Sequence, residues 1–353
     1  MVIRPVSFFL LVISIQGCVS VATQIPTQGA GQMQVFYATD RKPQKWDNPG
    51  VYYGSKRGDE IQYGVATIDV WPIDHDEENA DGEVRKIVSN TIDTAFSRAD
   101  QTGKNGFFKR LHDPARNGKP GDVMLFVHGF KRNFRAAAEN AALVSASIGF
   151  NGATVFWSWP SLDNAAGYLT DRTTLLWSQK HLAQFITELV QTGHARRLVL
   201  VAHSLGTQAL TQALFEEIGT DRLSAWQVID NLVLMAPDID LGIFQRDIVP
   251  AINRVDIPTT VYASSNDLAL ITSSSLNGYP RAGDSSDKIY TFPGIDTIDA
   301  TQVRQSFLGH SYYRSSFAVI DDLQFLIVGK KPIRKRPGLT RVQNKDQIYW
   351  KLE

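Results

Sequence analysis

The sequence predicts an α/β fold in which helices cover both faces of a mostly parallel sheet, in a single domain with no large lid. Short apolar runs that stop at polar or glycine residues are typical of strands buried on both faces. The segments between these runs carry apolar residues at helical spacing. The chain has 353 residues, 43% of them hydrophobic, which is enough to bury one large core.

The expected elements follow in chain order. Strands are predicted at residues 33–39, 61–71, 123–127, 153–157, 198–202, 232–235 and 260–263. Helix faces are predicted from the spacing of Leu182, Phe185, Ile186, Leu189 and Val190, and from that of Ala209, Leu210, Ala213, Leu214 and Ile218. Because strands and helices alternate, we expect right-handed crossovers between parallel strands.

The N-terminus predicts export. Arg4 precedes an apolar run over residues 6–15, and Gly17 precedes Cys18. A positive start, a short apolar core and a small residue before the cleavage point are typical of a signal peptide, and the run is too short to span a bilayer as a helix. Cys18 is the one cysteine of the sequence, which excludes a disulfide within the chain and a cysteine-based metal site.

Residues 15–18 resemble a bacterial lipobox, in which the cysteine becomes the lipidated first residue of the mature protein. We therefore predict a signal peptide over residues 1–17, a flexible tether over 18–32, the folded domain over 33–329 and a basic C-terminal tail over 330–353. The resemblance implies a lipid-anchored protein of the bacterial cell envelope, and Val19 implies the periplasmic face of the outer membrane. The alternative is an ordinary secretory signal and a secreted or periplasmic protein. A formal net charge of zero gives no reason to expect nucleic acid as a partner.

A candidate nucleophile stands in residues 202–206, whose sequence is Ala-His-Ser-Leu-Gly. This segment lies between a predicted strand and a predicted helix, and it matches the nucleophile elbow with alanine at the first glycine position. The elbow is so tight that its central serine takes a strained backbone conformation, and the flanking residues must be small. We therefore expect Ser204 to be a catalytic nucleophile.

A serine becomes a strong nucleophile when a base takes its proton. In hydrolases with this elbow the triad runs serine, acid, histidine along the chain. His310 is the only histidine after Ser204, so we expect it to be the general base. His128 precedes the elbow, and we expect it to brace a loop rather than to act as a catalyst.

The acid of the triad is expected at Asp267, after the predicted strand at 260–263, which we count as the seventh of the fold. This is the usual place of the residue that orients the histidine. Asp238 and Asp240, after the preceding strand, are the alternative, because some lipases take their acid from there. The stretch from Asp240 to the next predicted strand is too short for a large lid.

Two backbone amides are expected to form the oxyanion hole. One belongs to Leu205, directly after the nucleophile. The other belongs to Phe130, in the His128-Gly129-Phe130 segment after the predicted strand at 123–127. Gly129 would let the backbone approach the reacting atoms closely.

Six segments together resemble the uncharacterised bacterial α/β-hydrolase family known as domain of unknown function 900. They are residues 35–41, 126–130, 156–161, 202–206, 236–240 and 309–312. The resemblance covers nearly everything from residue 35 to about residue 329, and it implies the α/β-hydrolase fold and an esterase or lipase activity.

These observations predict a serine hydrolase that cleaves carboxylic esters of short or medium acyl chains through an acyl-enzyme. Its substrate would be a small-molecule or lipid ester, and the sequence predicts neither a cofactor nor a metal. Two alternatives stay open: an amidase or peptidase with the same triad, and a non-catalytic envelope lipoprotein that keeps the fold as a scaffold. A scaffold would have no need of Ser204, Asp267 and His310 together.

Overall fold

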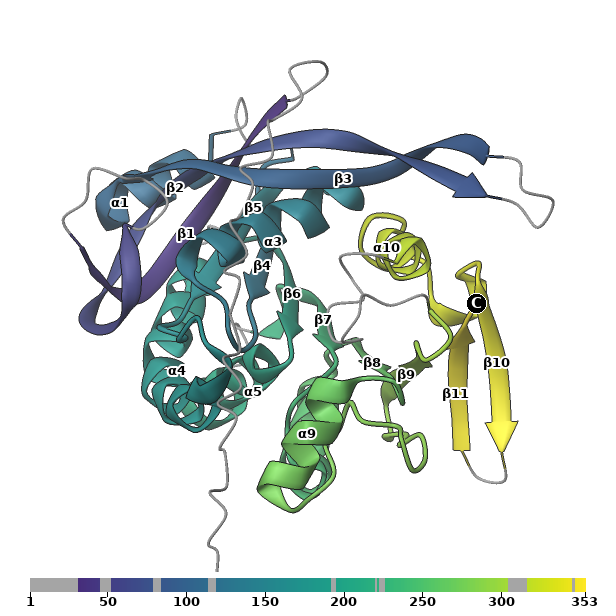
Figure 1. The fold of residues 1–353 in the computed structure, drawn as a ribbon. Coiled ribbons are helices and arrows are strands. Elements are labelled where there is room, and N and C mark those ends of the chain that lie inside the picture. Colours follow the sequence, from purple (N-terminus) through teal and green to yellow (C-terminus); the bar gives the residue numbers. More distant parts are fainter. Residues whose placement is uncertain are drawn as a thin grey trace, which may run out of the picture.

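The fold is seen in a computed structural model, which describes residues 31–44, 52–78, 84–113, 119–191, 195–219, 221, 226–303, 316–344 and 347–353. Cys18 and the predicted signal peptide lie outside the described residues. In the described part of the chain, eleven strands form one sheet in the order β10-β11-β9-β8-β7-β6-β4-β5-β1-β2-β3 (Figure 1). None of the helices in these ranges is long and apolar enough to cross a membrane.

The strands are β1 (Gly31–Pro43), β2 (Tyr53–Glu78), β3 (Val84–Gln101), β4 (Asp122–Val127), β5 (Ala153–Ser158), β6 (Arg197–His203), β7 (Ile229–Met235), β8 (Thr259–Ala263), β9 (Ile295–Asp299), β10 (Leu339–Asn344) and β11 (Gln347–Leu352). The helices are α1 (Gly103–Leu111), α3 (Phe134–Ser147), α4 (Tyr168–Gln191), α5 (Leu205–Gln212), α7 (Leu241–Ile243), α8 (Val249–Val255), α9 (Leu268–Asn277) and α10 (Phe317–Leu323). Short 3-10 or π-helical turns lie at Ala165–Gly167, Ala213–Ile218, Phe244–Ile248, Gln324–Val328 and Ile333–Lys335.

The middle of the sheet is parallel. Each neighbouring pair from β1 through β5, β4, β6, β7, β8 and β9 to β11 runs in the same direction. The antiparallel pairs lie at the two edges, where β2 and β3 extend one side and β10 the other. The predicted mostly parallel α/β sheet is confirmed.

Both faces of the sheet are buried, as β4 illustrates. Val123, Leu125 and Val127 belong to one buried cluster, together with residues of α4 and α5. Met124 and Phe126 belong to the opposite cluster, together with residues of α3 and α10. Figure 1 shows these two pairs of helices on opposite sides of the sheet. A strand buried on both faces needs apolar residues at every position, which explains the unbroken runs in the sequence.

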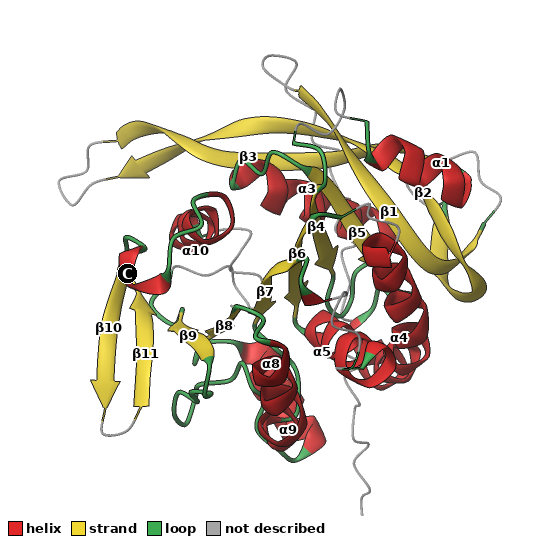
Figure 2. Cartoon of the chain, turned by 180° about the vertical axis from the view of Figure 1, so that it is seen from behind, coloured by secondary structure: helices red, strands yellow, loops and turns green. Residues whose placement is uncertain are grey.

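β2 and β3 form a hairpin much longer than the core strands, and it runs on over α3 (Figure 2). Hydrogen bonds to Glu139 of α3 help to hold it there: the backbone N–H of Phe96 donates to Glu139 Oε1 at 2.9 Å, and Thr94 Oγ1 donates to the Glu139 carbonyl at 3.3 Å. The strand predicted at 61–71 is the inner part of β2.

The C-terminal segment differs from the prediction. We expected residues 330–353 to form a basic tail, whereas β10 and β11 add a hairpin to the sheet, with Trp350 and Leu352 in the core. Arg336, one of the basic residues behind that expectation, has a fully buried side chain and pairs with the buried Asp322 at 3.0 Å. Basic residues in a sequence predict an exposed segment, and this prediction fails where a buried carboxylate pairs with one of them.

Candidate active site

The candidate nucleophile sits at the turn between β6 and α5. Ser204 has φ 53° and ψ −129°, a conformation that costs a residue with a side chain of the order of 1–3 kcal/mol. The backbone holds it there: Ser204 N–H donates to the Met235 carbonyl at 3.0 Å, and its own carbonyl accepts from Thr207 N at 3.0 Å and Thr207 Oγ1 at 2.6 Å. The structure thus has the strained strand-to-helix turn that the elbow pattern predicts.

Two glycines let the elbow meet the loop after β4. A Cβ built on Gly206 would lie 2.5 Å from the His128 carbonyl oxygen and 2.6 Å from that of Val127. A Cβ on Gly129 would lie 2.8 Å from Ser204 Cβ and 2.9 Å from the His203 carbonyl oxygen. All four distances are shorter than van der Waals contact, so neither position has room for a side chain.

Two residues next to this close approach are the candidates for the oxyanion hole. Leu205 is the first residue of α5, so its N–H has no intrahelical acceptor, and the helix dipole adds positive potential at the same point. Phe130 lies in the loop after β4, and β4 is the parallel neighbour of β6. The sequence-predicted oxyanion residues Leu205 and Phe130 therefore lie at the same carboxyl edge of the sheet as the elbow.

His128 is buried beneath this loop. Its Nδ1 is 2.9 Å from the Gly129 carbonyl, its Nε2 is 3.4 Å from Ser158 Oγ, and its ring stacks on Trp159. Burial, with a further contribution from the Arg41 charge, lowers the pKa of His128 to about 3, so the imidazole is neutral at ordinary pH. These contacts fit the bracing role that we expected of His128.

The two candidate acid positions differ in what holds their carboxylates. Asp267 follows β8, is fully buried, and caps α9 by accepting from Ala269 N at 3.1 Å and Leu270 N at 3.0 Å. Both capping bonds end on Oδ1, so the cap does not use Oδ2. Asp240 caps α7 by accepting from Ile243 N at 3.0 Å.

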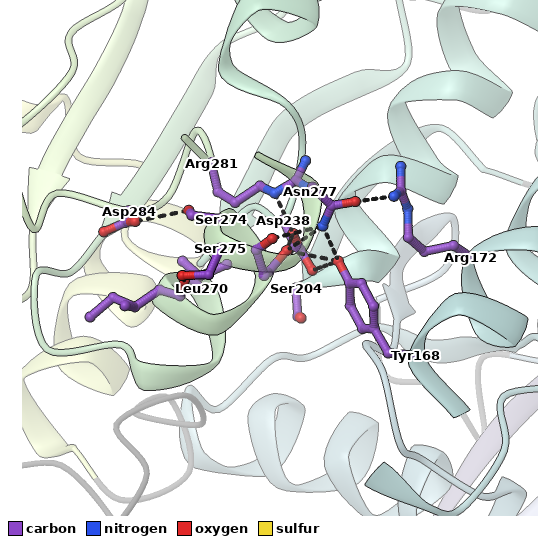
Figure 3. A network of polar contacts seen from close by, with 12 residues as sticks. Tyr168, Arg172, Ser204, Asp238, Leu270, Ser274, Ser275, Asn277, Arg281 and Asp284 are labelled. Carbon is purple, nitrogen blue, oxygen red and sulfur yellow. Dashed lines mark hydrogen bonds and ion pairs between the residues drawn. The ribbon is translucent and has the colours of Figure 1, made fainter. Parts of the chain in front are cut away.

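Asp238 is held by a network that Figure 3 shows next to Ser204. Ser273 Oγ donates to Asp238 Oδ1 at 2.6 Å, Tyr168 Oη donates to Oδ2 at 2.9 Å, and Arg281 Nε lies 3.3 Å from Oδ1. The backbone N–H of Asp238 also donates to the Ser204 carbonyl at 3.4 Å. With both carboxylate oxygens engaged, Asp238 is built into the wall behind the elbow.

Tyr168 is a site residue that the sequence did not reveal. Its ring packs edge-on against Phe130, with centroids 5.4 Å apart, while its hydroxyl contacts Asp238 and lies 2.7 Å from Ser273 Oγ. Burial raises the pKa of the Tyr168 hydroxyl to about 12, so it stays protonated. No local pattern marks Tyr168, since it reads simply as the start of a helix.

His310, the predicted general base, lies outside the described residues. Among the described residues, no group of three or more His, Cys, Asp or Glu side chains is arranged to hold a metal ion.

Comparison with solved structures finds folds that resemble this chain at low identity. An uncharacterized protein from Bacillus cereus aligns at 10% identity and a TM-score of 0.38, covering 60% of this chain and 61% of that one. Est1E from Butyrivibrio proteoclasticus aligns at 9% identity and 0.39, over 62% and 91%. A lipase-esterase related protein from Clostridium acetobutylicum aligns at 11% and 0.34, over 60% and 95%.

A search of curated proteins gives no match. A family model, in contrast, matches residues 106–329, which include the elbow, the loop after β4 and the three candidate acids. The chain therefore belongs to the family described as alpha/beta hydrolase of unknown function, DUF900.

Proposed function

We propose that this protein is a serine hydrolase that cleaves carboxylic esters of short or medium acyl chains. The observation that carries the proposal is the strained backbone of Ser204, at an elbow that meets the loop after β4 through two glycines with no room for a side chain. A merely structural serine at a strand end has no need of such strain, whereas a nucleophile that must project from its turn does.

In the proposed mechanism Ser204 Oγ attacks the ester carbonyl while His310 takes its proton. The amides of Leu205 and Phe130 stabilise the oxyanion. His310 then protonates the leaving alcohol, and water hydrolyses the acyl-enzyme by the reverse sequence of proton transfers. The proposed preference for short or medium acyl chains rests on the sequence, in which the stretch after Asp240 is too short for a large lid.

We propose Asp267 as the acid that orients His310. Its buried position directly after β8 supports this choice, and the hydrogen bonds to both carboxylate oxygens of Asp238 support it further. Asp267→Asn should lower kcat by about 10⁴-fold, the loss typical of a triad whose histidine is misoriented. Asp238→Asn serves as the comparison; if it, and not Asp267→Asn, abolished turnover, the acid would be Asp238.

The decisive experiment is labelling with a fluorophosphonate probe. Wild-type protein should be labelled, and Ser204→Ala should not. Ser275→Ala, which removes an exposed hydroxyl from α9, is the matched control and should label like wild type. Folded wild-type protein that resists the probe would favour the scaffold reading, and faster cleavage of nitroanilides than of nitrophenyl esters would favour an amidase.

The envelope location is a separate proposal. We propose that Cys18 is lipidated after export, on the lipobox resemblance of the sequence. Metabolic labelling with a palmitate analogue should mark the wild-type protein and not Cys18→Ala; equal labelling of both would contradict the anchor.

A further inference from the structure

We propose that Arg41 is a positioning residue for the oxyanion hole: through Ser158 and His128, and directly through Arg132, it sets the direction of the Phe130 amide. This inference rests on the proposed hydrolase function. It assigns a role to a buried cation at the end of β1, two strands away from β4 in the sheet.

Arg41 is 1% exposed, and each of its three side-chain nitrogens donates to a backbone or side-chain acceptor. Nε donates to Ser158 Oγ at 2.8 Å, and Nη2 donates to the Arg132 carbonyl at 2.7 Å. Nη1 donates to the carbonyls of Gly54 at 2.9 Å and Ser161 at 3.3 Å. Burial lowers the pKa of Arg41 to about 10, so the guanidinium is still charged at neutral pH.

The chain of contacts from Arg41 to the loop has one consistent hydrogen direction. The Gly129 carbonyl can only accept, so Nδ1 of the neutral His128 carries the hydrogen of that 2.9 Å contact. Nε2 is then an acceptor and takes the hydroxyl hydrogen of Ser158. Ser158 Oγ in turn accepts from Arg41 Nε. The bond from Arg41 leaves the hydroxyl hydrogen of Ser158 available to Nε2, which favours the Nδ1–H tautomer that the Gly129 carbonyl requires.

The tautomer matters because of peptide geometry. The carbonyl of Gly129 and the N–H of Phe130 belong to one planar unit, and in a trans peptide they point in opposite directions. A hydrogen bond from His128 to that carbonyl therefore aims the Phe130 N–H away from His128.

Arg41 also holds the far side of the same loop. Its bond to the Arg132 carbonyl is supported by Ser161 Oγ, which accepts from Arg132 N at 3.3 Å. Phe130 is thus flanked by two anchored points, Gly129 and Arg132, that share one guanidinium. Loss of either anchor would let the peptide between them turn.

Ser158→Ala tests the relay selectively, because it deletes one hydroxyl and leaves the bond from Arg41 to Arg132 intact. We expect kcat for a nitrophenyl butyrate to fall about 10- to 100-fold with KM within about twofold, since complete loss of one oxyanion donor typically costs 10²–10³-fold in kcat. The rate of labelling by a fluorophosphonate should fall in parallel. Arg41→Lys, which keeps the positive charge and loses the planar set of guanidinium donors, should likewise lower kcat with little change in KM.

Ser145→Ala is the matched control. Ser145 is equally buried and pairs with Thr154 on β5 at 2.5 Å, away from the loop. Its loss should lower the melting temperature as Ser158→Ala does, and kcat should stay at the wild-type value. The ¹⁵N shifts of the His128 ring provide a second readout: wild type should show hydrogen on Nδ1, and Ser158→Ala a mixture of tautomers.

Three outcomes separate the possibilities. A drop in kcat confined to Ser158→Ala and Arg41→Lys, with a changed His128 tautomer, supports the positioning role. Folded variants with wild-type kcat overturn it while leaving the hydrolase proposal intact. Wild-type protein that neither hydrolyses esters nor reacts with the probe overturns the hydrolase proposal, and this inference with it.

Discussion

Replacing Gly206 by alanine tests whether the close approach between the elbow and the loop after β4 is needed for catalysis. The added Cβ would lie 2.5 Å from the carbonyl oxygen of His128 and 2.6 Å from that of Val127. Ordinary contact requires about 3.5 Å, so the elbow and the loop must separate by about 1 Å. Both obstructing atoms belong to the backbone of β4 and its loop, which no rotamer change can move aside.

Gly206→Ala should affect both the stability of the fold and the rate of catalysis. Overpacking of a rigid site costs about 1–3 kcal/mol of unfolding free energy, or a fall of several degrees in Tm. A displacement of about 1 Å between a nucleophile and its oxyanion donors costs about 100-fold in rate. We therefore expect Gly206→Ala to remain folded and to lose about two orders of magnitude in kcat, with a small change in KM.

The assay is steady-state hydrolysis of a nitrophenyl ester together with thermal unfolding. Gly106→Ala is the control: it lies in α1, where an added Cβ comes no closer than 3.3 Å, to the Thr102 side chain, and alanine favours the helix. That variant should keep its kcat and its stability. If Gly206→Ala matched wild type in both kcat and Tm, the tight contact would be unimportant, and the reasoning from it would be refuted.

Three further predictions concern stability. Burial lowers the pKa of His128 from 6.5 to about 3 in the native state, so below pH 6.5 the unfolded chain binds a proton that the native protein does not, and the free energy of unfolding decreases as the pH falls. The loss is about 2 kcal/mol by pH 5, and urea unfolding at pH 7 and pH 5 should show it for wild type and not for His128→Gln. Equal pH dependence in the two proteins would contradict it. Asp322→Ala leaves the buried Arg336 without its 3.0 Å partner and should lower the free energy of unfolding in urea by about 3–5 kcal/mol. Adding Arg336→Met should recover much of this loss, and a double variant as unstable as the single one would contradict the reasoning. Trp350→Ala should lower the free energy of unfolding by about 3–5 kcal/mol, because the ring anchors the C-terminal hairpin in the core. Ile348→Ala, at an exposed position of the same strand, should change it by less than about 0.5 kcal/mol. Similar losses in the two variants would contradict the anchoring role of Trp350.

The prediction of the fold succeeded where the signal is local. Continuous apolar runs predicted each core strand from β4 to β8 to within a few residues, because a strand covered on both faces has no polar side. The small residues around Ser204 predicted the strained turn, since only small side chains fit there. The C-terminal hairpin was missed, because the basic residues that precede it resemble the start of a solvated tail, and the buried partner of Arg336 is not visible in the sequence.

The sequence by itself determined the α/β class and the position of the elbow, because spacing and side-chain size act between residues that are near in the chain. Only the tertiary structure decided what surrounds the elbow. Tyr168 meets Asp238 across 70 positions, and Arg41 meets Arg132 across 91. These contacts depend on which strands become neighbours in the sheet, and a hydrogen bond between distant residues leaves no periodic trace in the chain. Buried polar groups must nevertheless find partners, so the assembled sheet determines which charges support the site.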